Sequence, residues 1–440
     1  MKEKLNSMSE TGFLKLVFAF FSAAFLIAAL CMPDRKDMFS GFLTILSSPC
    51  KVSTNYFALG GYSATFLNAG LVGLICLAVY HFSGAKLNHV STLAFLLTLG
   101  FCTWGINVLN ILPTMLGVVL YCLVKKETLA ANANAVLFST GIAPLISELM
   151  VRYPNPEAAG FTPVGVILAL IVGIGIGFFL PAGLVHSPNV HKGFDLYNAA
   201  VPVGMTAFFL QALLHKTLGV DIPAAPAGET LQIASPLIVN VFCCVVFGLC
   251  VLASLWLGGT PKDYIAMLRD PQLHTSVADR HGKEIFLMNL GIYGLFILGY
   301  YNLIGASFNG VTFGVIFCML ACCNAGSTPA TVLPIMLGYV AASWIARWTS
   351  GVAGGTFAGA INAQAIVVGL CYANGLSPIS RKYGWPFAFL AAMMHYTMVT
   401  TVPSLHGGYC LYNGGFTAGL VCLLLIPILE RFVPQRKLGA

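Results

Sequence analysis

The chain has 440 residues, of which 58% are hydrophobic and 8% are charged, with a formal net charge of +7. This composition excludes an ordinary soluble globular protein, because almost every long segment would be insoluble at a surface, and it predicts a polytopic membrane protein. The positive charges lie in short connecting stretches and at both ends of the chain. Lipid headgroups attract charge placed in this way, so we expect a lipid bilayer and not nucleic acid as partner.

The first apolar run covers residues 13–32 and follows Lys2 and Lys4. No Ala-x-Ala site precedes the charged residues 34–37, so we expect a retained first span and not a cleaved signal peptide. Residues 36–46 are too short to cross about 30 Å of hydrocarbon, which predicts a helix at the membrane surface. Further apolar segments, several of them interrupted by Gly or Pro, follow at 56–82, 90–104, 106–124, 129–150, 161–180 and 193–214.

Residues 215–236 have the composition of a linker, since they combine prolines with Gly228, Asp221 and Glu229. Beyond them the pattern starts again, with residues 237–257 corresponding to the first span and 262–271 to the surface helix. The predicted organisation is an N-terminal tail (1–12), a first membrane repeat (13–214), the linker (215–236), a second membrane repeat (237–430) and a C-terminal tail (431–440).

An internal duplication supports this organisation. Residues 68–117 align without a gap to 289–338 at one offset (289 − 68 = 338 − 117 = 221), and eighteen of the fifty positions are identical. Residues 138–144 then match 372–378 at an offset of 234 (372 − 138). We therefore predict an all-α integral membrane protein of two homologous copies, each with about five spans plus broken or re-entrant helices.

The relative direction of the two copies stays open between inverted and parallel. Arg35 and Lys36 in the first copy correspond to Lys262 and Arg269 in the second. Similar charge at equivalent loops mildly favours parallel copies under the positive-inside bias.

A second repeated motif carries polar groups into the apolar part of each copy. Residues 188–204 match 403–419 at one offset (403 − 188 = 215), and both stretches run directly into an apolar helix. The first free N–H groups of such a helix can face a polar site inside a membrane protein. We expect the two motifs to meet around one shared, water-accessible cavity.

Within these motifs an Asn follows a Tyr and lies seven residues after a His, and two further Asn residues begin the aligned central segments. Such amide and imidazole groups suit the path of a polar solute. The alternative is that the Asn residues are helix caps or interhelical contacts and that each His bonds to a loop carbonyl. The predicted solute path consists of Asn68, His191, Tyr197, Asn198, Asn289, Asn324, Thr328, His406, Tyr412 and Asn413.

Enzyme signatures such as H-E-x-x-H, G-x-S-x-G and Walker A are absent, so we expect no enzyme activity. The fourteen cysteines lie almost all in apolar runs without the spacing of metal ligands, which predicts no metal site and no cofactor. Asp195 and Glu284 each lie close to a lysine, Lys192 and Lys283, which predicts ion pairs at the membrane interface.

The duplicated pattern resembles an uncharacterised family of bacterial multi-pass membrane proteins with two internal copies, which implies the bacterial cytoplasmic membrane. Residues 408–420 and 66–74 also resemble, more distantly, the Tyr-Asn-Gly…Leu-Val-Gly helix of urea transporters. We expect a transporter or channel for a small polar, neutral solute along a pseudo-twofold path. A Na⁺- or proton-coupled secondary transporter, a non-transporting membrane scaffold or a membrane-embedded enzyme stays open, as does a homo-oligomer.

Overall fold

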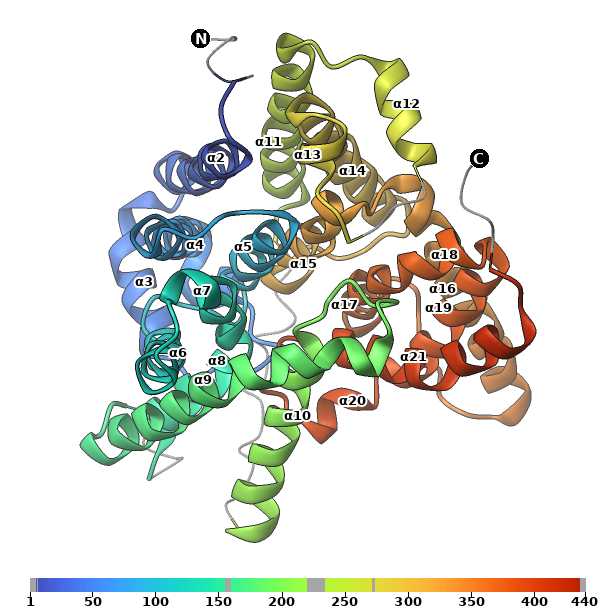
Figure 1. The fold of residues 1–440 in the computed structure, drawn as a ribbon. Coiled ribbons are helices and arrows are strands. Elements are labelled where there is room, and N and C mark those ends of the chain that lie inside the picture. Colours follow the sequence, from blue (N-terminus) through green and yellow to red (C-terminus); the bar gives the residue numbers. More distant parts are fainter. Residues whose placement is uncertain (1–4, 6, 155–159, 220–233, 271–273, 436–440) are drawn as a thin grey trace.

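The computed structural model describes the chain except for residues 1–4, 6, 155–159, 220–233, 271–273 and 436–440 (Figure 1). The described residues form helices and connecting loops without a strand, as predicted for an all-α protein. Eight of the described helices are long and apolar enough to cross a membrane, four in each copy against about five predicted. They cover Glu10–Cys31, Tyr56–Ser83, Leu129–Arg152, Pro163–His191, Pro236–Leu257, Lys283–Leu303, Pro329–Ala353 and Asn413–Phe432.

The first copy has three long helices, α2, α4 and α9, with shorter elements between and after them. Its elements are α2 (Glu10–Cys31), η1 (Arg35–Asp37), α3 (Met38–Leu46), α4 (Tyr56–Ser83), α5 (His89–Phe101), α6 (Leu112–Lys125), α7 (Leu129–Phe138), η2 (Ser139–Ile142), α8 (Ala143–Arg152), α9 (Pro163–His191), α10 (Ala200–Gln211) and the π-helical turn η3 (Ala212–Thr217).

The second copy repeats this order. Its elements are α11 (Pro236–Leu257), α12 (Pro261–Arg269), α13 (Val277–Arg280), α14 (Lys283–Leu303), α15 (Gly310–Leu320), η4 (Ala321–Ala325), α16 (Pro329–Ala353), α17 (Gln364–Ala373), η5 (Asn374–Leu376), α18 (Ser377–Lys382), α19 (Trp385–Val399), α20 (Val402–Leu405) and α21 (Asn413–Phe432). Most of the predicted linker, residues 220–233, lies outside the described residues.

Residues at equivalent positions make the same local hydrogen bonds in the two copies. Asn88 caps α5 through a capping box with Ser91, and Asn309 caps α15 through the same box with Thr312. Such a box satisfies N–H groups that a helix start leaves without an intrahelical partner. The positions differ by the predicted offset (309 − 88 = 221), so the alignment of the copies holds at the level of single hydrogen bonds.

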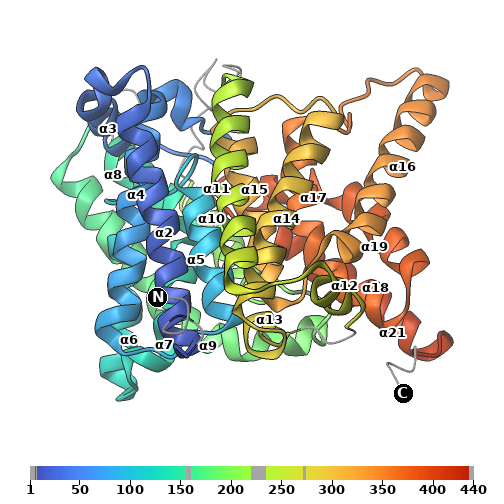
Figure 2. The same ribbon diagram turned by 90° about the horizontal axis from the view of Figure 1, so that it is seen from above.

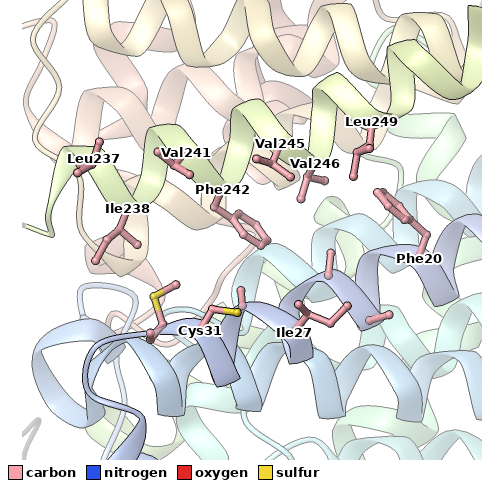
Figure 3. A pocket seen from close by; sticks show the side chains of 14 residues that line it. Phe20, Ile27, Cys31, Leu237, Ile238, Val241, Phe242, Val245, Val246 and Leu249 are labelled. Carbon is pink, nitrogen blue, oxygen red and sulfur yellow. The ribbon is translucent and has the colours of Figure 1, made fainter.

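The first helices of the two copies, α2 and α11, run in opposite directions (Figure 2). Cys31 at the end of α2 lies beside Leu237 at the start of α11, and Phe20 lies beside Leu249 (Figure 3). Between these helices lies a groove of about 580 Å³ whose fourteen lining residues are all hydrophobic.

A second equivalent pair, α5 and α15, is also antiparallel. Thr103, just past α5, donates to the carbonyl of Gly310 at the start of α15 at 2.6 Å. At the other end Asn324, just past α15, donates to Thr92 near the start of α5 at 3.1 Å. Two separate pairs of equivalent helices therefore run antiparallel, which is the geometry of inverted copies. The preference for parallel copies drawn from loop charge is wrong, because the loops compared are similarly basic and carry little information on direction.

Helices α5 and α6 form a hairpin that leaves and returns to one end of the molecule. The Tyr80 hydroxyl, near the end of α4, donates to Asn134 near the start of α7 at 2.8 Å. The hairpin between these two helices therefore starts and ends at the same level. In the second copy, Asn309 before α15 donates to Gln364 at the start of α17 at 2.5 Å. The copies thus contain hairpins at equivalent places, but α16 has 25 residues and is long enough to cross a membrane, whereas α6 has 14.

Helices α3 and α12 are short and mostly exposed. Ile45 is the only buried residue of α3, and α12 buries Tyr264 and Met267. Each helix has nine residues, too few to cross a bilayer. Because they follow the ends of the antiparallel helices α2 and α11, they lie at opposite ends of the molecule (Figure 2). Their place along a membrane surface stays a prediction.

Candidate functional site

One helix of each copy breaks near the centre of the molecule. In the first copy α7 gives way to the 3-10 turn η2 before α8, and in the second α17 gives way to η5 before α18. Pro144 and Pro378 lie in the first turn after each break. Proline has no N–H and cannot continue the hydrogen-bond ladder of the preceding helix. The breaks therefore leave backbone carbonyls that need partners elsewhere.

These partners come from the other copy. The carbonyl of Gly141, in the first break, accepts a bond of 2.9 Å from the Leu411 N–H, which belongs to the second copy. The carbonyl of Gly375, in the second break, accepts a bond of 3.0 Å from the Leu196 N–H of the first copy. The two bonds are equivalent, because their residues differ by the offsets of the two repeated segments (411 − 196 = 215 for the donors and 375 − 141 = 234 for the acceptors). Each polar motif therefore closes the broken helix of the opposite copy.

Tyrosine rings cover the same two glycines. A methyl group added at Gly141 would lie 2.2 Å from the ring of Tyr412, and one at Gly375 would lie 2.7 Å from the ring of Tyr197. Any side chain larger than hydrogen would push the rings away, so the contact requires glycine at both breaks. We call these two glycines, with Leu196, Tyr197, Leu411 and Tyr412, the crossed site.

Helices α10 and α21 cross beside this site, also in a twofold manner. A methyl group at Gly204 would meet Phe416 at 2.5 Å, and one at Gly419 would meet Val201 at 2.8 Å. These are equivalent contacts, because 416 − 201 = 419 − 204 = 215. The structure thus brings the two predicted motifs together, with a pseudo-twofold axis passing between α10 and α21. α21 begins at Asn413, whereas α10 begins at Ala200, two residues after Asn198.

The core of the two motifs is buried in this structure. Tyr197 and Tyr412 are fully buried, His191 and His406 are 2% and 1% exposed, and Asn413 is 4% exposed, whereas Asn198 is half-buried. A shared, water-accessible cavity around the motifs stays a prediction.

Asn68 and Asn289 bind the loops at the tips of the hairpins. The amide nitrogen of Asn68 donates to the carbonyls of Cys102 and Ile106, both at 2.8 Å. Asn289 makes the two equivalent bonds in the second copy, both at 3.0 Å. This geometry corresponds to the interhelical contact weighed above as the alternative to a solute ligand.

The two remaining predicted residues of hairpin 2, α15–α16, also have local partners. Thr328 caps α16 through a capping box with Thr331. The Asn324 carbonyl oxygen accepts the backbone N–H of Ala278 at 3.0 Å, so this side chain ties the tip of hairpin 2 to α13. Neither residue lies in the crossed site as defined above.

The two histidines of the motifs have different surroundings. The Nε2 atom of His191 lies 2.9 Å from the Asn198 side-chain oxygen, which joins the end of α9 to the following loop. Among the described residues, His406 has no hydrogen-bond partner at either ring nitrogen, and its ring packs edge-on against Phe416. Burial lowers the pKa of His406 to about 4, which favours a neutral ring.

Several polar groups of the centre were missed by the sequence analysis. Ser327 donates to Asn374 at 2.6 Å and so joins the tip of hairpin 2 to the break η5. His395, fully buried in α19, bridges the Tyr339 hydroxyl at 2.6 Å and the Gly414 carbonyl at 2.8 Å. Asn374 was visible as part of the repeated 372–378 segment, whereas a single His in an apolar run gives no comparable signal.

The ion pair predicted between Lys192 and Asp195 does not form. Lys192 pairs with Glu430 of α21. Lys283 donates to the backbone carbonyl of Leu5, before α2, at 3.2 Å. Asp195 is fully buried and its Oδ2 atom has no hydrogen-bond partner among the described residues.

The inverted copies, the apolar helices and the crossed site define an all-helical membrane-like protein with two internal copies. The chain belongs to the family described as "Protein of unknown function (DUF1576)", whose model matches residues 34–216 and 261–431. These two matched regions fit the two-copy arrangement.

One relative is "Uncharacterized protein YhfT" of Escherichia coli (strain K12), with 26% identity over 131 residues. The match covers 28% of this chain and 30% of that protein, so the chain spans less than a third of the relative's length in the alignment. No solved structure is significantly similar to the chain. The family and the relative give no support to the resemblance to urea transporters.

Proposed function

We propose that this protein carries a small, polar, uncharged solute across the bacterial cytoplasmic membrane by alternating access. The observation that supports this most directly is a pair of backbone hydrogen bonds between the copies. The Leu411 N–H donates to the Gly141 carbonyl in the first break, and the Leu196 N–H donates to the Gly375 carbonyl in the second. Inverted copies whose broken helices meet at a pseudo-twofold axis are a common architecture of secondary transporters. Such a centre can open to either side by movement of one copy against the other.

The chemistry of the centre favours an uncharged polar solute. The crossed site offers backbone groups and hydroxyls, and the Tyr412 hydroxyl has no partner among the described residues. A buried hydroxyl without a partner costs free energy, so a solute or water that binds it would recover part of that cost. The nearest described neighbours of the two glycines include one carboxyl group, that of Asp195, and no basic side chain, which makes the site a poor match for a strongly charged solute.

The closed packing favours a transporter over an open channel. Leu411, Tyr412 and Tyr197 are completely buried, so the described site has no exposed mouth in this conformation. The groove of about 580 Å³ between α2 and α11 is lined by hydrophobic residues alone (Figure 3), which suits lipid chains and not a polar solute. We therefore place the solute at the crossed site.

The experiment is solute flux in liposomes that contain the purified full-length protein. Stopped-flow shrinkage would be recorded with urea, glycerol and acetamide as uncharged probes and with ammonium as the charged comparison. Gly141→Ala and Gly375→Ala place a methyl group against the tyrosine rings, and we expect each to lower flux at least tenfold. Gly175→Ala is the matched control, because no atom lies within 4 Å of the added methyl position.

Flux in the wild type equal to that of empty liposomes for every probe would contradict transport of this solute class. Normal flux through both Gly141→Ala and Gly375→Ala, with the variants folded, would place the path away from the crossed site. Size-exclusion profiles in detergent would show that the variants are folded.

A further inference from the structure

Asp195 is a buried acid that exists in only one of the two copies. It lies in the loop between α9 and α10, directly before Leu196 and Tyr197 of the crossed site, and is 0% exposed. Its equivalent in the second copy is Cys410 (195 + 215 = 410), which is also fully buried. The two halves of the site therefore differ by one ionisable carboxyl group.

The carboxyl group touches the break of the second copy. Its Oδ1 atom accepts the Tyr197 N–H at 2.9 Å, and a methyl group added at Gly375 would lie 2.2 Å from the same atom. Its Oδ2 atom is buried and has no hydrogen-bond partner among the described residues. Half of the hydrogen-bonding capacity of this group is therefore unused in the closed conformation.

Among the described residues, the buried carboxyl has no salt-bridge partner. The nearby Lys382 lies over the ring of the adjacent Phe194, 5.0 Å from its centroid. The titratable groups that interact electrostatically with it are the thiols of Cys322 in η4 and Cys422 in α21. The nearby Lys192 pairs with Glu430. Asp195 lies outside the membrane-spanning helices, and burial raises its pKa to about 7.

A proton fits this site better than a metal cation does. Hard cations such as Ca²⁺ take roughly six to eight oxygen ligands. The neighbours of Asp195 are an amide N–H, two thiols and the backbone at Gly375, which supply few oxygens. A proton needs only one carboxyl oxygen, and the Oδ2 atom is unused. Ionisable groups buried in membrane proteins also often mark proton relays.

We propose that Asp195 binds the proton that couples this transporter to a pH gradient. The inference rests on the proposed transport function and specifies its driving ion. Opening the crossed site would move the break at Gly375 away from the carboxyl group and admit water, which favours its ionised form. The proton affinity then differs between the closed and open conformations, and such a difference is what coupling requires.

Protonation of Asp195 can be measured without knowing the solute. Infrared spectra of the full-length protein in lipid nanodiscs would be recorded from pH 5 to pH 9. We expect a carboxylic C=O band that disappears with a midpoint near neutral pH in the wild type and is missing in Asp195→Asn. The exposed Asp263→Asn of α12 is the matched control and should keep the band. A spectrum in which Asp195→Asn removes no band that titrates between pH 6 and pH 8 would overturn the inference.

Coupling is tested in liposomes that contain a trapped pH indicator. Any of the probes urea, glycerol and acetamide that the wild type carries should be driven by an imposed pH gradient and should move protons with it. The gradient-driven flux of Asp195→Asn should be at least tenfold lower than that of the wild type, whereas the variant should retain exchange of the same probe without a gradient. Wild-type flux that ignores the gradient would contradict proton coupling and leave transport standing, whereas absence of any wild-type flux would contradict the proposed function itself.

Discussion

Single residues hold the hairpin tips in place, and Asn68 with Asn289 shows this most clearly. Each amide donates to two backbone carbonyls of a hairpin tip, at 2.8 Å in the first copy and at 3.0 Å in the second. Removing the amide leaves two buried carbonyls without this partner, which costs on the order of 1–3 kcal/mol for each group. Asn68→Ala and Asn289→Ala should therefore lower the thermal unfolding temperature in detergent by several degrees.

The matched control for these variants is Asn132→Ala. Asn132 is half-buried on α7, and its side chain donates to the exposed carboxylate of Glu127. Surface contacts of this kind contribute little to stability, so its unfolding temperature should stay within about one degree of the wild type. Equal stability of all three variants would show that the tips are held by other contacts.

Asp195 gives a pH dependence of stability whose sign follows from its burial. The folded protein holds this proton up to a pKa of about 7, whereas the ordinary value is 3.8. Between these values the folded state binds more protons than the unfolded state, so stability falls as pH rises, by at most about 1.4 kcal/mol per pH unit. Above pH 7 both states have lost the proton and this contribution becomes constant.

Thermal unfolding at pH 5, 6, 7 and 8 would measure this contribution. As the pH rises to 7, we expect the wild type to lose stability relative to Asp195→Asn. Above pH 7 the difference in stability between the two proteins should stay constant. A constant difference between the two proteins across the whole range would show that Asp195 titrates at its ordinary pKa.

At the scale of helices, the close crossing of α5 and α15 depends on glycine. A methyl group at Gly314 would lie 2.2 Å from the carbonyl oxygen of Gly100, and this backbone atom cannot move aside as a side-chain end can. Gly314→Ala should therefore separate the two helices and strongly reduce the yield of folded protein. Gly248→Ala in α11 is the control, since nothing lies within 4 Å of its added methyl position. Fluorescence-detected size exclusion of both variants measures the outcome.

The breaks were predictable at this scale, whereas their partners were not. The repeated Gly141-x-x-Pro144 and Gly375-x-x-Pro378 patterns indicate interrupted helices directly, because proline and glycine act on the local backbone. The bond from Leu411 to Gly141 joins residues far apart in the chain, and one sequence contains no signal for it. For the same reason Asn68 could be predicted as a buried polar residue but not as the ligand of a hairpin tip.

At the scale of the whole molecule, the inverted copies place the two surface helices at opposite ends. The charge of the loops predicted parallel copies because Arg35 and Lys36 were compared with the equally basic start of α12, and a comparison of two basic loops does not distinguish the two directions. Other loops carry the information. The end of α4 lies at the level of the start of α2, since the Leu87 N–H donates to Thr11 at 3.0 Å, and Lys86 therefore lies at the end where α2 begins. Lys125 and Lys126 at the end of α6 and the basic residues of α12 lie at this same end, whereas Arg35 and Lys36 lie at the other. By the positive-inside bias we infer that the end where α2 begins faces the cytoplasm.

This arrangement predicts which face of the membrane each surface helix can be labelled from. Ser40→Cys in α3 and Lys262→Cys in α12 would be made separately, with the exposed Cys31 and Cys244 replaced by serine. A membrane-impermeant maleimide should label Ser40→Cys from outside intact spheroplasts and Lys262→Cys only in inside-out vesicles. Both residues are exposed, so a failure to label cannot come from burial within the protein. Labelling of both positions from the same face would contradict inverted copies, and with them the alternating-access architecture on which the crossed site depends.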